Sequence, residues 1–273
     1  MKNVMYAMDT HFMGENEGPT PLEQAHMVKE AGYDDYYMTG ATEDVERFRA
    51  LLRASNEAAL GFNAAFQVFE ISQAPTEVDF ERIGSVLRDL DSPTRFEIAL
   101  THGGFGKNMG EESLDEQALA WLNPIAELLD EHEIEGSLYP HFAYYLETFT
   151  DALRLAEKMD HPRMKVMFCG YHFFRVAKEK SAADLFAKAG ERMNAVNLCG
   201  SRRLPNPDEN INGLNPTIEP LDTGEMDNKA IVRELIRIGY AGPIGIQGYG
   251  VTAPAKEALN RSIRNLNSLL EQG

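Results

Sequence analysis

The sequence predicts an α/β fold, a single (β/α)8 barrel that spans residues 1–273 as one domain. Short apolar runs alternate with amphipathic segments along the whole chain, in about eight repeats, the number that closes such a barrel. The first run is not followed by the GxGxxG turn of a dinucleotide-binding open sheet, and the alternation continues evenly to the C-terminus. A doubly wound open sheet is therefore the less favoured alternative.

Apolar runs bounded by turn residues and helix starts are predicted as strands: 4–7, 34–40, 60–70, 95–104, 136–141, 163–175, 193–203 and 242–250. The segments between them carry apolar residues at helical spacing and are predicted as helices: 20–32, 42–52, 78–90, 113–129, 147–162, 181–190, 227–239 and the stretch from Pro254 onward.

Capping residues place several of these helix ends. Thr20 and Glu23 form a capping-box pattern with proline at the first helical position, and Gly32 is typical of a helix C-terminus. Pro124 is predicted to bend or interrupt its helix. Other helix starts are predicted at polar residues that precede amphipathic segments: Thr42, Ser113, Ser181 and Asp227.

The stretch Gly136–Arg175 shows the repeating unit most clearly. Its first apolar run ends near His141 and its second near His172, with a helical interval between them that is long enough for a parallel crossover. In barrels built from such units the chemistry lies at the C-terminal ends of the strands. We therefore expect the two imidazoles to meet at one cavity, where a histidine pair can share general acid and base work, one neutral and the other charged.

Composition excludes some classes of partner. A net charge of −17 and a pI of about 4.8 argue against binding a nucleic-acid backbone, which requires positive charge. Cys169 and Cys199 provide neither a disulfide framework nor a CxxC metal motif. No apolar stretch reaches transmembrane length, so a cytoplasmic protein is expected, although a removed signal sequence would leave no trace. The oligomeric state stays open, a homo-oligomer included.

The second half of the chain resembles the xylose-isomerase-like TIM barrels, a family of sugar isomerases and epimerases, inosose dehydratases and endonuclease IV nucleases. The match lies in LDTGEMD at 221–227, where the family's G-x-x-D opens the last crossover helix, and in the following GYAGPIGIQGYG, which corresponds to the G-Y-x-G-x-[IV] segment of the eighth strand. The YPH and GYH segments stand where the family commonly has E-x-H and D-x-x-H. The resemblance covers the whole chain in outline and implies a TIM barrel.

The resemblance also implies a divalent metal, which typical members hold with Glu, Asp, His and Glu from strands five to eight. In this chain the corresponding positions are uncharged: Tyr139, Cys169, Asn197 and Gln247. Hard divalent ions prefer carboxylate oxygens, so no metal site of the family type is predicted and the cofactor is left unknown. Zn²⁺ bound by His141, His172 and Cys169 is kept as an alternative.

Further candidates lie at predicted strand ends. Glu70 and Asp9 could accept a proton if burial raised the pKa, the alternative being solvated loop positions. Glu70 is taken as a catalytic candidate together with His141 and His172. For His102, a contact with the substrate and a purely structural role are both kept as interpretations.

Substrate-binding candidates complete the predicted site: His102, Tyr139, Asn197, Arg202 and Gln247. Arg202 and Arg203 follow strand seven, where family members often place a basic residue against sugar or phosphate oxygens. The loop 204–222, rich in Pro, Asn and Gly, is predicted to form a lid or an active-site wall. A few of the aromatic residues near strand ends could stack on a sugar ring: Tyr6, Phe12, Phe66, Phe142, Tyr144, Tyr145, Phe173 and Phe174.

The predicted function is that of a sugar isomerase or epimerase, or a related lyase, which abstracts a proton next to the carbonyl of a small sugar or keto-sugar. The alternative is a non-catalytic carbohydrate-binding barrel that has lost the metal site of its family. A nuclease is disfavoured by the acidic surface and the replaced ligands. The sequence does not identify the sugar or decide whether it is phosphorylated.

Overall fold

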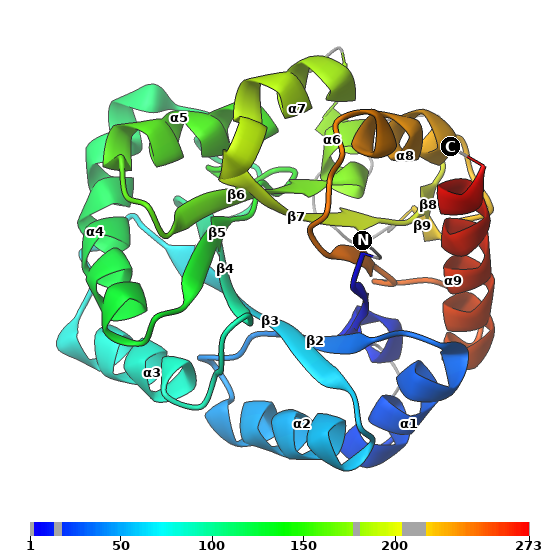
Figure 1. Ribbon diagram of the computed structural model, residues 1–273. Helices are drawn as coiled ribbons and strands as arrows, with labels where there is room; N and C mark the ends of the chain where they lie inside the picture. The colour runs from blue at the N-terminus through cyan, green and yellow to red at the C-terminus, as the bar shows by residue number, and fades with distance from the viewer. Residues whose placement is uncertain (1–2, 14–17, 177–180, 204–216, 273) are drawn as a thin grey trace.

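The computed structural model of the protein describes residues 3–13, 18–176, 181–203 and 217–272. Eight parallel strands close into a barrel, and helices form a ring around it (Figure 1). The barrel strands are β1 (Met5–Met8), β2 (Asp35–Thr39), β3 (Gly61–Glu70), β4 (Arg95–Thr101), β5 (Glu135–Leu138), β6 (Met164–Cys169), β7 (Met193–Leu198) and β10 (Ile244–Ile246). They are hydrogen-bonded in sequence order, and β10 closes the barrel onto β1. The prediction of a single (β/α)8 barrel is confirmed.

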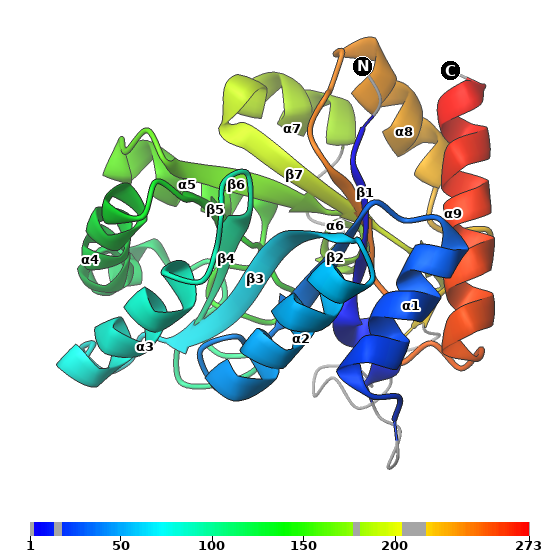
Figure 2. The ribbon, with the colours of Figure 1, turned by 60° about the horizontal axis from the view of Figure 1, so that its bottom comes forward.

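The helices are α1 (Pro21–Ala31), α2 (Val45–Glu57), α3 (Glu77–Leu87), α4 (Asp115–Glu131), α5 (Phe149–Met159), α6 (Gly170–Val176), α7 (Ala182–Ala189), α8 (Asn228–Arg237) and α9 (Ala255–Glu271). Short 3₁₀ turns lie at Asp9–Phe12 (η1), Glu112–Leu114 (η2) and Gly190–Arg192 (η3), and β8 (Gly200–Ser201) pairs antiparallel with β9 (Ile218–Glu219). The chain enters the barrel through β1, and α9 lies beside α1 on the outer ring (Figure 2).

Helix starts follow the predicted caps in most places. Thr20 forms the full capping box of α1, and Gly32 ends that helix in the left-handed conformation with φ 100°. Ser181 and Asp227 accept hydrogen bonds from the first turns of α7 and α8, as predicted.

Four local predictions are wrong. Asp44, not Thr42, caps α2, because the helix begins only at Val45 and the Asp44 side chain accepts from the Arg47 N–H at 2.9 Å. Ser113 lies inside η2, so α4 begins directly after a 3₁₀ turn without a side-chain cap. The predicted strand 163–175 ends at Cys169, and its remaining residues belong to α6 (Gly170–Val176). Pro124 lies within α4, which runs from Asp115 to Glu131, so the proline does not interrupt the helix.

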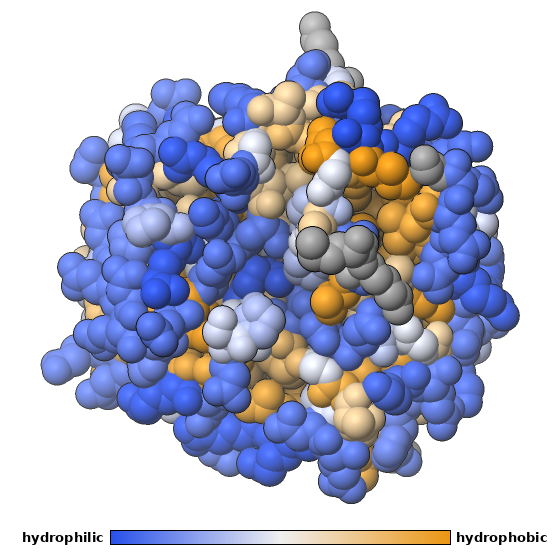
Figure 3. All heavy atoms as spheres, viewed as in Figure 1, coloured by the Kyte–Doolittle hydropathy of each residue, from blue (hydrophilic) through white to orange (hydrophobic). Residues whose placement is uncertain are grey.

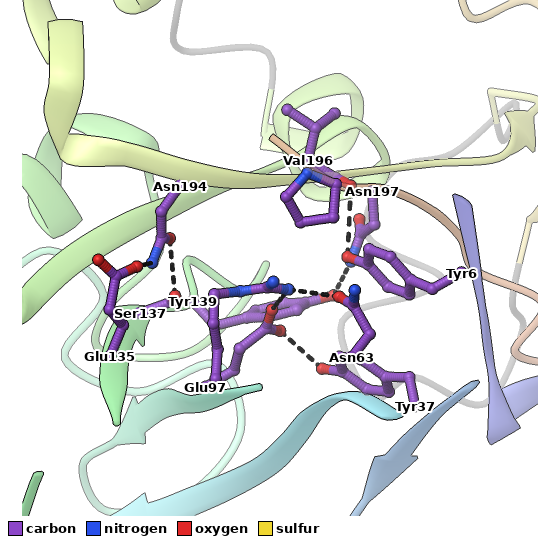
Figure 4. A network of polar contacts seen from close by, with 12 residues as sticks. Tyr6, Tyr37, Asn63, Glu97, Glu135, Ser137, Tyr139, Asn194, Val196 and Asn197 are labelled. Carbon is purple, nitrogen blue, oxygen red and sulfur yellow. Dashed lines mark hydrogen bonds and ion pairs between the residues drawn. The ribbon is translucent and has the colours of Figure 1, made fainter. Parts of the chain in front are cut away.

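The interior of the barrel is filled partly by polar side chains (Figure 4). The guanidinium of Arg95 donates to Glu97 Oε1 at 3.0 Å and to Asn63 Oδ1 at 2.7 Å. The Tyr37 hydroxyl donates to the other oxygen of Glu97 at 2.8 Å, and its ring stacks on Tyr6. The side chains of Arg95 and Glu97 are 5% and 0% exposed, so the pair is a buried ion pair with additional hydrogen bonds. Alternating inward-facing residues build such layers in closed barrels.

Gly245 gives the Tyr6 ring its place in this interior. A Cβ atom at Gly245 would lie 2.1 Å from two carbons of the Tyr6 ring, so only glycine fits on β10 at this level. The Tyr6 hydroxyl then reaches past β10 to the Val196 carbonyl on β7, to which it donates at 3.3 Å.

The outer surface is largely hydrophilic on the face that carries the N-terminus, with hydrophobic residues gathered between the helices (Figure 3). None of the described helices is both long and apolar enough to cross a membrane.

Breaking the interior ion pair should destabilise the barrel. Arg95→Met is expected to lower the free energy of unfolding by about 3–5 kcal/mol, because Glu97 is left buried without its charged partner. The double variant Arg95→Met/Glu97→Gln should recover most of the loss, since Gln can still accept from Tyr37. Urea unfolding measures both. Arg237→Met, which removes the exposed pair with Glu234, is the control and should cost at most about 1 kcal/mol. Equal losses for the single and double variants would contradict this account.

Candidate functional site

A cavity of about 370 Å³ lies at the C-terminal ends of the barrel strands. Met8 and Thr39 are the last residues of β1 and β2, and Tyr139 and Gln247 directly follow β5 and β10. The described residues that line the cavity are Met8, Thr10, Met13, Thr39, Phe66, Phe105, Tyr139, His141, Phe142, Tyr144, Tyr171, His172, Ile218, Gln247 and Tyr249. Its size suits one small ligand.

His141 and His172 lie together at this cavity. His141 stands three residues after the end of β5, and His172 lies in the first turn of α6, three residues after the end of β6. The centroids of the two imidazole rings are 4.0 Å apart, and the rings are inclined by 39°. His172 is 2% exposed, whereas His141 is partly exposed. The predicted convergence of the two histidines on one cavity is therefore the observed arrangement.

The main chain of Phe142 sets the protonation of both rings. The Phe142 N–H donates to Nδ1 of His172 at 3.1 Å, so this nitrogen carries no proton. The Phe142 carbonyl can only accept, so Nδ1 of His141, 2.8 Å away, must carry a proton. In their neutral forms, His172 is therefore protonated on Nε2 and His141 on Nδ1. One ring has Nε2 as a donor and the other has Nε2 as an acceptor.

Burial keeps both rings neutral near pH 7. It lowers the pKa of His141 to about 4, although the hydrogen bond to the Phe142 carbonyl acts in the opposite direction. Burial also lowers the pKa of His172 well below its usual range, with further contributions from His141 and Arg175. The expected division into one neutral and one charged imidazole is thus replaced by two neutral rings with different tautomers.

The turn that follows β5 holds this arrangement. The Tyr144 N–H closes it on the His141 carbonyl at 3.0 Å, and Ala143 adopts φ 63° inside it. Such a left-handed conformation costs a non-glycine residue about 1–2 kcal/mol. The Ala143 carbonyl in turn accepts from the Gly106 N–H at 2.7 Å, which ties the turn to the loop after β4. Tyr144 stacks on His141 with 3.9 Å between centroids.

His172 has a donor without a partner. Its Nε2 is buried and makes no hydrogen bond. A buried donor that is left unsatisfied costs about 1–3 kcal/mol, and such exceptions call for an explanation. A bound ligand with an oxygen acceptor would satisfy this group.

The four positions that correspond to the family's metal ligands lie beside the histidine pair and are connected to one another. Asn197 Nδ2 donates to the Tyr139 hydroxyl at 3.1 Å, an interaction visible in Figure 4. That hydroxyl donates to Cys169 Sγ at 3.4 Å. The Cys169 thiol then donates to Gln247 Oε1 at 3.6 Å. The polar atoms form a directed chain from Asn197 to Gln247.

This donor set does not fit a hard divalent ion. Burial raises the pKa of Tyr139 well above its usual range and that of Cys169 to about 12, so both keep their protons. The neutral amide oxygens that remain are weak ligands without carboxylates. The Zn²⁺ alternative fits no better: the Phe142 N–H uses the lone pair of His172 Nδ1, the ring proton is therefore on Nε2, and neither nitrogen of this ring offers a lone pair to the ion. Within the described ranges, no three His, Cys, Asp or Glu side chains are grouped as metal ligands.

Glu70 and His102 lie outside the cavity lining. Glu70 accepts hydrogen bonds from the N–H groups of Gly103, Gly104 and Ser72, which lower its pKa and fix the loop after β4. His102 bonds to Asn108 through one ring nitrogen and to the side chain of Gln117 through the other. The polar atoms of Glu70 and His102 are therefore used in hydrogen bonds to residues of the surrounding loops and helices.

The other predicted candidates, Arg202, Arg203 and Asp9, are also engaged in ion pairs or cation–π contacts with neighbouring side chains. Arg202 pairs with Glu219 at 3.1 Å, and the guanidinium of Arg203 lies over the Phe174 ring at 4.3 Å. Asp9 is fully buried and pairs with Arg47 at 2.6 Å, while burial raises its pKa to about 6. None of these side chains lines the cavity.

Segments outside the barrel strands contribute cavity residues that were not among the individually predicted site residues: Thr10, Met13, Phe105, Tyr171, Ile218 and Tyr249. Of the predicted aromatic candidates, Phe66, Phe142 and Tyr144 line the cavity, while Tyr6 and Tyr145 are buried in the core. Ile218 belongs to the predicted lid, of which residues 204–216 lie outside the described part of the chain.

Fold and sequence together identify the class of protein. The family model of the xylose isomerase-like TIM barrels matches residues 25–269, and the chain belongs to this family. A comparison with curated proteins finds no match.

Solved structures with the same fold include enzymes that act on sugars. The 3-keto-D-glucoside 4-epimerase YcjR from E. coli is 17% identical, with a TM-score of 0.72 over 98% of this chain and 100% of that one. The D-allulose 3-epimerase from Methylomonas sp. is 15% identical, with a TM-score of 0.69 and 98% of each chain covered. The probable 3-DHS dehydratase AsbF from Bacillus anthracis is 15% identical, with a TM-score of 0.75 over 96% of this chain and 98% of that one. At these identities the likeness establishes the fold alone.

The uncharged donor set predicts that divalent metal ions will not stabilise the protein. A specific site filled at about 100 times its Kd would add about 2.7 kcal/mol. We expect the thermal unfolding midpoint to be the same in excess Mn²⁺, excess Mg²⁺ and EDTA. A higher midpoint with either ion, lost in Gln247→Leu, would show that the four positions do hold a metal.

Proposed function

We propose that the protein is a sugar isomerase, epimerase or related lyase that abstracts a proton next to the carbonyl of a sugar or keto-sugar. The observation that carries this proposal is the pair of neutral imidazoles with opposite tautomers at one cavity. General acid–base chemistry on a carbonyl compound needs one group that takes a proton from carbon and another that stabilises the developing oxyanion.

In this proposal Nε2 of His141 is the base. It takes the proton from the carbon next to the carbonyl, and the electron pair of that C–H bond moves into the enolate. The Nε2–H of His172 donates to the carbonyl oxygen, where the negative charge develops. For epimerisation, the opposite face of the same carbon takes a proton from solvent, and the imidazolium of His141 releases its proton to solvent. For isomerisation, the hydroxyl on that carbon passes its proton to the former carbonyl oxygen, and His141 returns its proton to the former carbonyl carbon.

The electrostatics support this division of roles. With a pKa of about 4, His141 is unprotonated near pH 7 and available as a base. A base of such low pKa gains from any interaction that stabilises its protonated form, and the Phe142 carbonyl on Nδ1 provides one. The buried, unpartnered Nε2–H of His172 costs nothing further to desolvate when it meets the substrate oxygen.

Neighbouring polar groups can hold the substrate. Gln247, at the end of the hydrogen-bond chain described above, and Tyr139, within that chain, line the same cavity. Family membership and the similar epimerases support a sugar-modifying reaction. The predicted cytoplasmic location and the predicted absence of a nucleic-acid partner remain predictions.

Deuterium exchange tests this proposal without knowledge of the product. The protein is incubated in D₂O with a panel of ketoses and keto-sugars, and NMR follows the exchange of the hydrogen next to the carbonyl. His141→Ala and His172→Ala should each slow exchange by about 10²–10⁴-fold, because each removes one half of the acid–base pair.

The matched control is His26→Ala, a substitution on the exposed surface of α1 that should leave exchange unchanged. Circular dichroism and thermal unfolding check that each variant is folded. Full exchange in folded His172→Ala would refute the proposed role of that imidazole. Sugar binding without exchange in the wild type would instead support a carbohydrate-binding barrel.

A further inference from the structure

The cavity side chains bear on a question that the sequence left open, namely whether the substrate is phosphorylated. The described lining consists of aromatic, methionine, isoleucine, threonine and glutamine side chains together with the two histidines. Since burial keeps both histidines neutral, the described lining carries no formal charge near pH 7. Its donors and acceptors are those of neutral groups: hydroxyls, an amide and imidazoles.

One wall of the cavity is aromatic. Phe105, from the loop after β4, meets Phe142 and Tyr144 edge-to-face at centroid distances of 6.1 and 6.0 Å. Phe66 packs edge-to-face on Tyr139 at 4.8 Å, deeper in the same cavity. Rings held in this way present flat apolar surface, which suits the C–H face of a sugar while the hydroxyls face the polar groups.

Three of the described arginines that follow strand ends have partners outside the lining. Arg47 donates to Asp9 and to the Thr39 carbonyl. Arg202 pairs with Glu219. The guanidinium carbon of Arg175 lies 4.9 Å from the centroid of the Phe142 ring. The charges of Arg47 and Arg202 are thus paired with carboxylates, and the guanidinium of Arg175 lies over an aromatic ring and outside the described lining.

A phosphate group would be unfavourable in these surroundings. It carries a charge of about −1.5 to −2 near pH 7, and sites that bind it supply arginine, lysine or clustered N–H donors. Transfer of such a charge into an aromatic cavity without a paired cation is costly. The net charge of −17 on the whole chain adds repulsion at longer range.

We infer that the cavity binds an uncharged sugar or keto-sugar, with its apolar face on the Phe105–Phe142–Tyr144 wall and an oxygen at His172, and that it selects against the phosphorylated form. This inference rests on the proposed function and narrows its substrate class. Selection arises from the difference in desolvation between a hydroxyl and a phosphate at the same position.

The test compares neutral ketoses and aldoses, D-fructose among them, with their 6-phosphates, using the full-length protein. Binding is followed by NMR at the Cε1–H signals of His141 and His172, with inorganic phosphate as a further probe. We expect a neutral sugar to bind at least about tenfold more tightly than its phosphate, a difference of about 1.4 kcal/mol. Inorganic phosphate should not shift either signal.

A charge-adding variant tests the cause of the selection. Tyr249 lines the cavity and is 46% exposed, so a cation at its position should reach an incoming phosphate without disturbing the core. Tyr249→Arg should raise the affinity for the phosphate relative to the neutral sugar by about tenfold, whereas the matched variant Tyr249→Gln should not.

The outcomes separate the two proposals. Equal or tighter binding of the phosphorylated sugar, or competition by inorganic phosphate, would overturn the inference about charge. Deuterium exchange on a phosphorylated sugar would overturn it too, while it leaves the acid–base proposal standing. If no sugar of either kind binds or exchanges, both proposals fail.

Discussion

The main-chain groups of Phe142 lie between two imidazole rings and give each ring a different free nitrogen. The N–H of this residue occupies Nδ1 of His172, and its carbonyl occupies Nδ1 of His141. Since backbone groups cannot exchange donor and acceptor roles, the tautomers are set by the path of the chain. The left-handed Ala143 and the hydrogen bond from Gly106 hold that path in place. The proposed acid–base function therefore depends on one turn after β5.

At the four positions where typical family members have metal ligands, this protein has hydrogen bonds between neutral side chains. Within the family pattern, strands five to eight direct ligands toward one ion. Here Tyr139, Cys169, Asn197 and Gln247 use their polar atoms on one another. Farther into the barrel, Arg95 and Glu97 place the charged groups in a closed pair. The two neutral imidazoles therefore lie above side chains whose charges are paired and whose polar atoms bond mainly to one another.

The sequence predicted the barrel and the meeting of His141 and His172, because strand ends in a parallel barrel converge at one edge. It could not predict the tautomers, which depend on a turn of four residues. Glu70 and His102 also stand at strand ends, but the Gly103 and Gly104 N–H groups and the Asn108 side chain occupy them. These hydrogen bonds depend on loop geometry, which the periodicity of apolar residues in the sequence does not encode. For the same reason Asp44 replaced Thr42 as a cap.

The most direct test of the account is a measurement of the two tautomers by ¹⁵N NMR of protein labelled in its histidine rings. At neutral pH the account predicts a proton on Nδ1 of His141 and on Nε2 of His172, with His141 becoming charged only as the pH falls toward its pKa of about 4. The same tautomer in both rings, or a charged imidazolium at either position at pH 7, would contradict it.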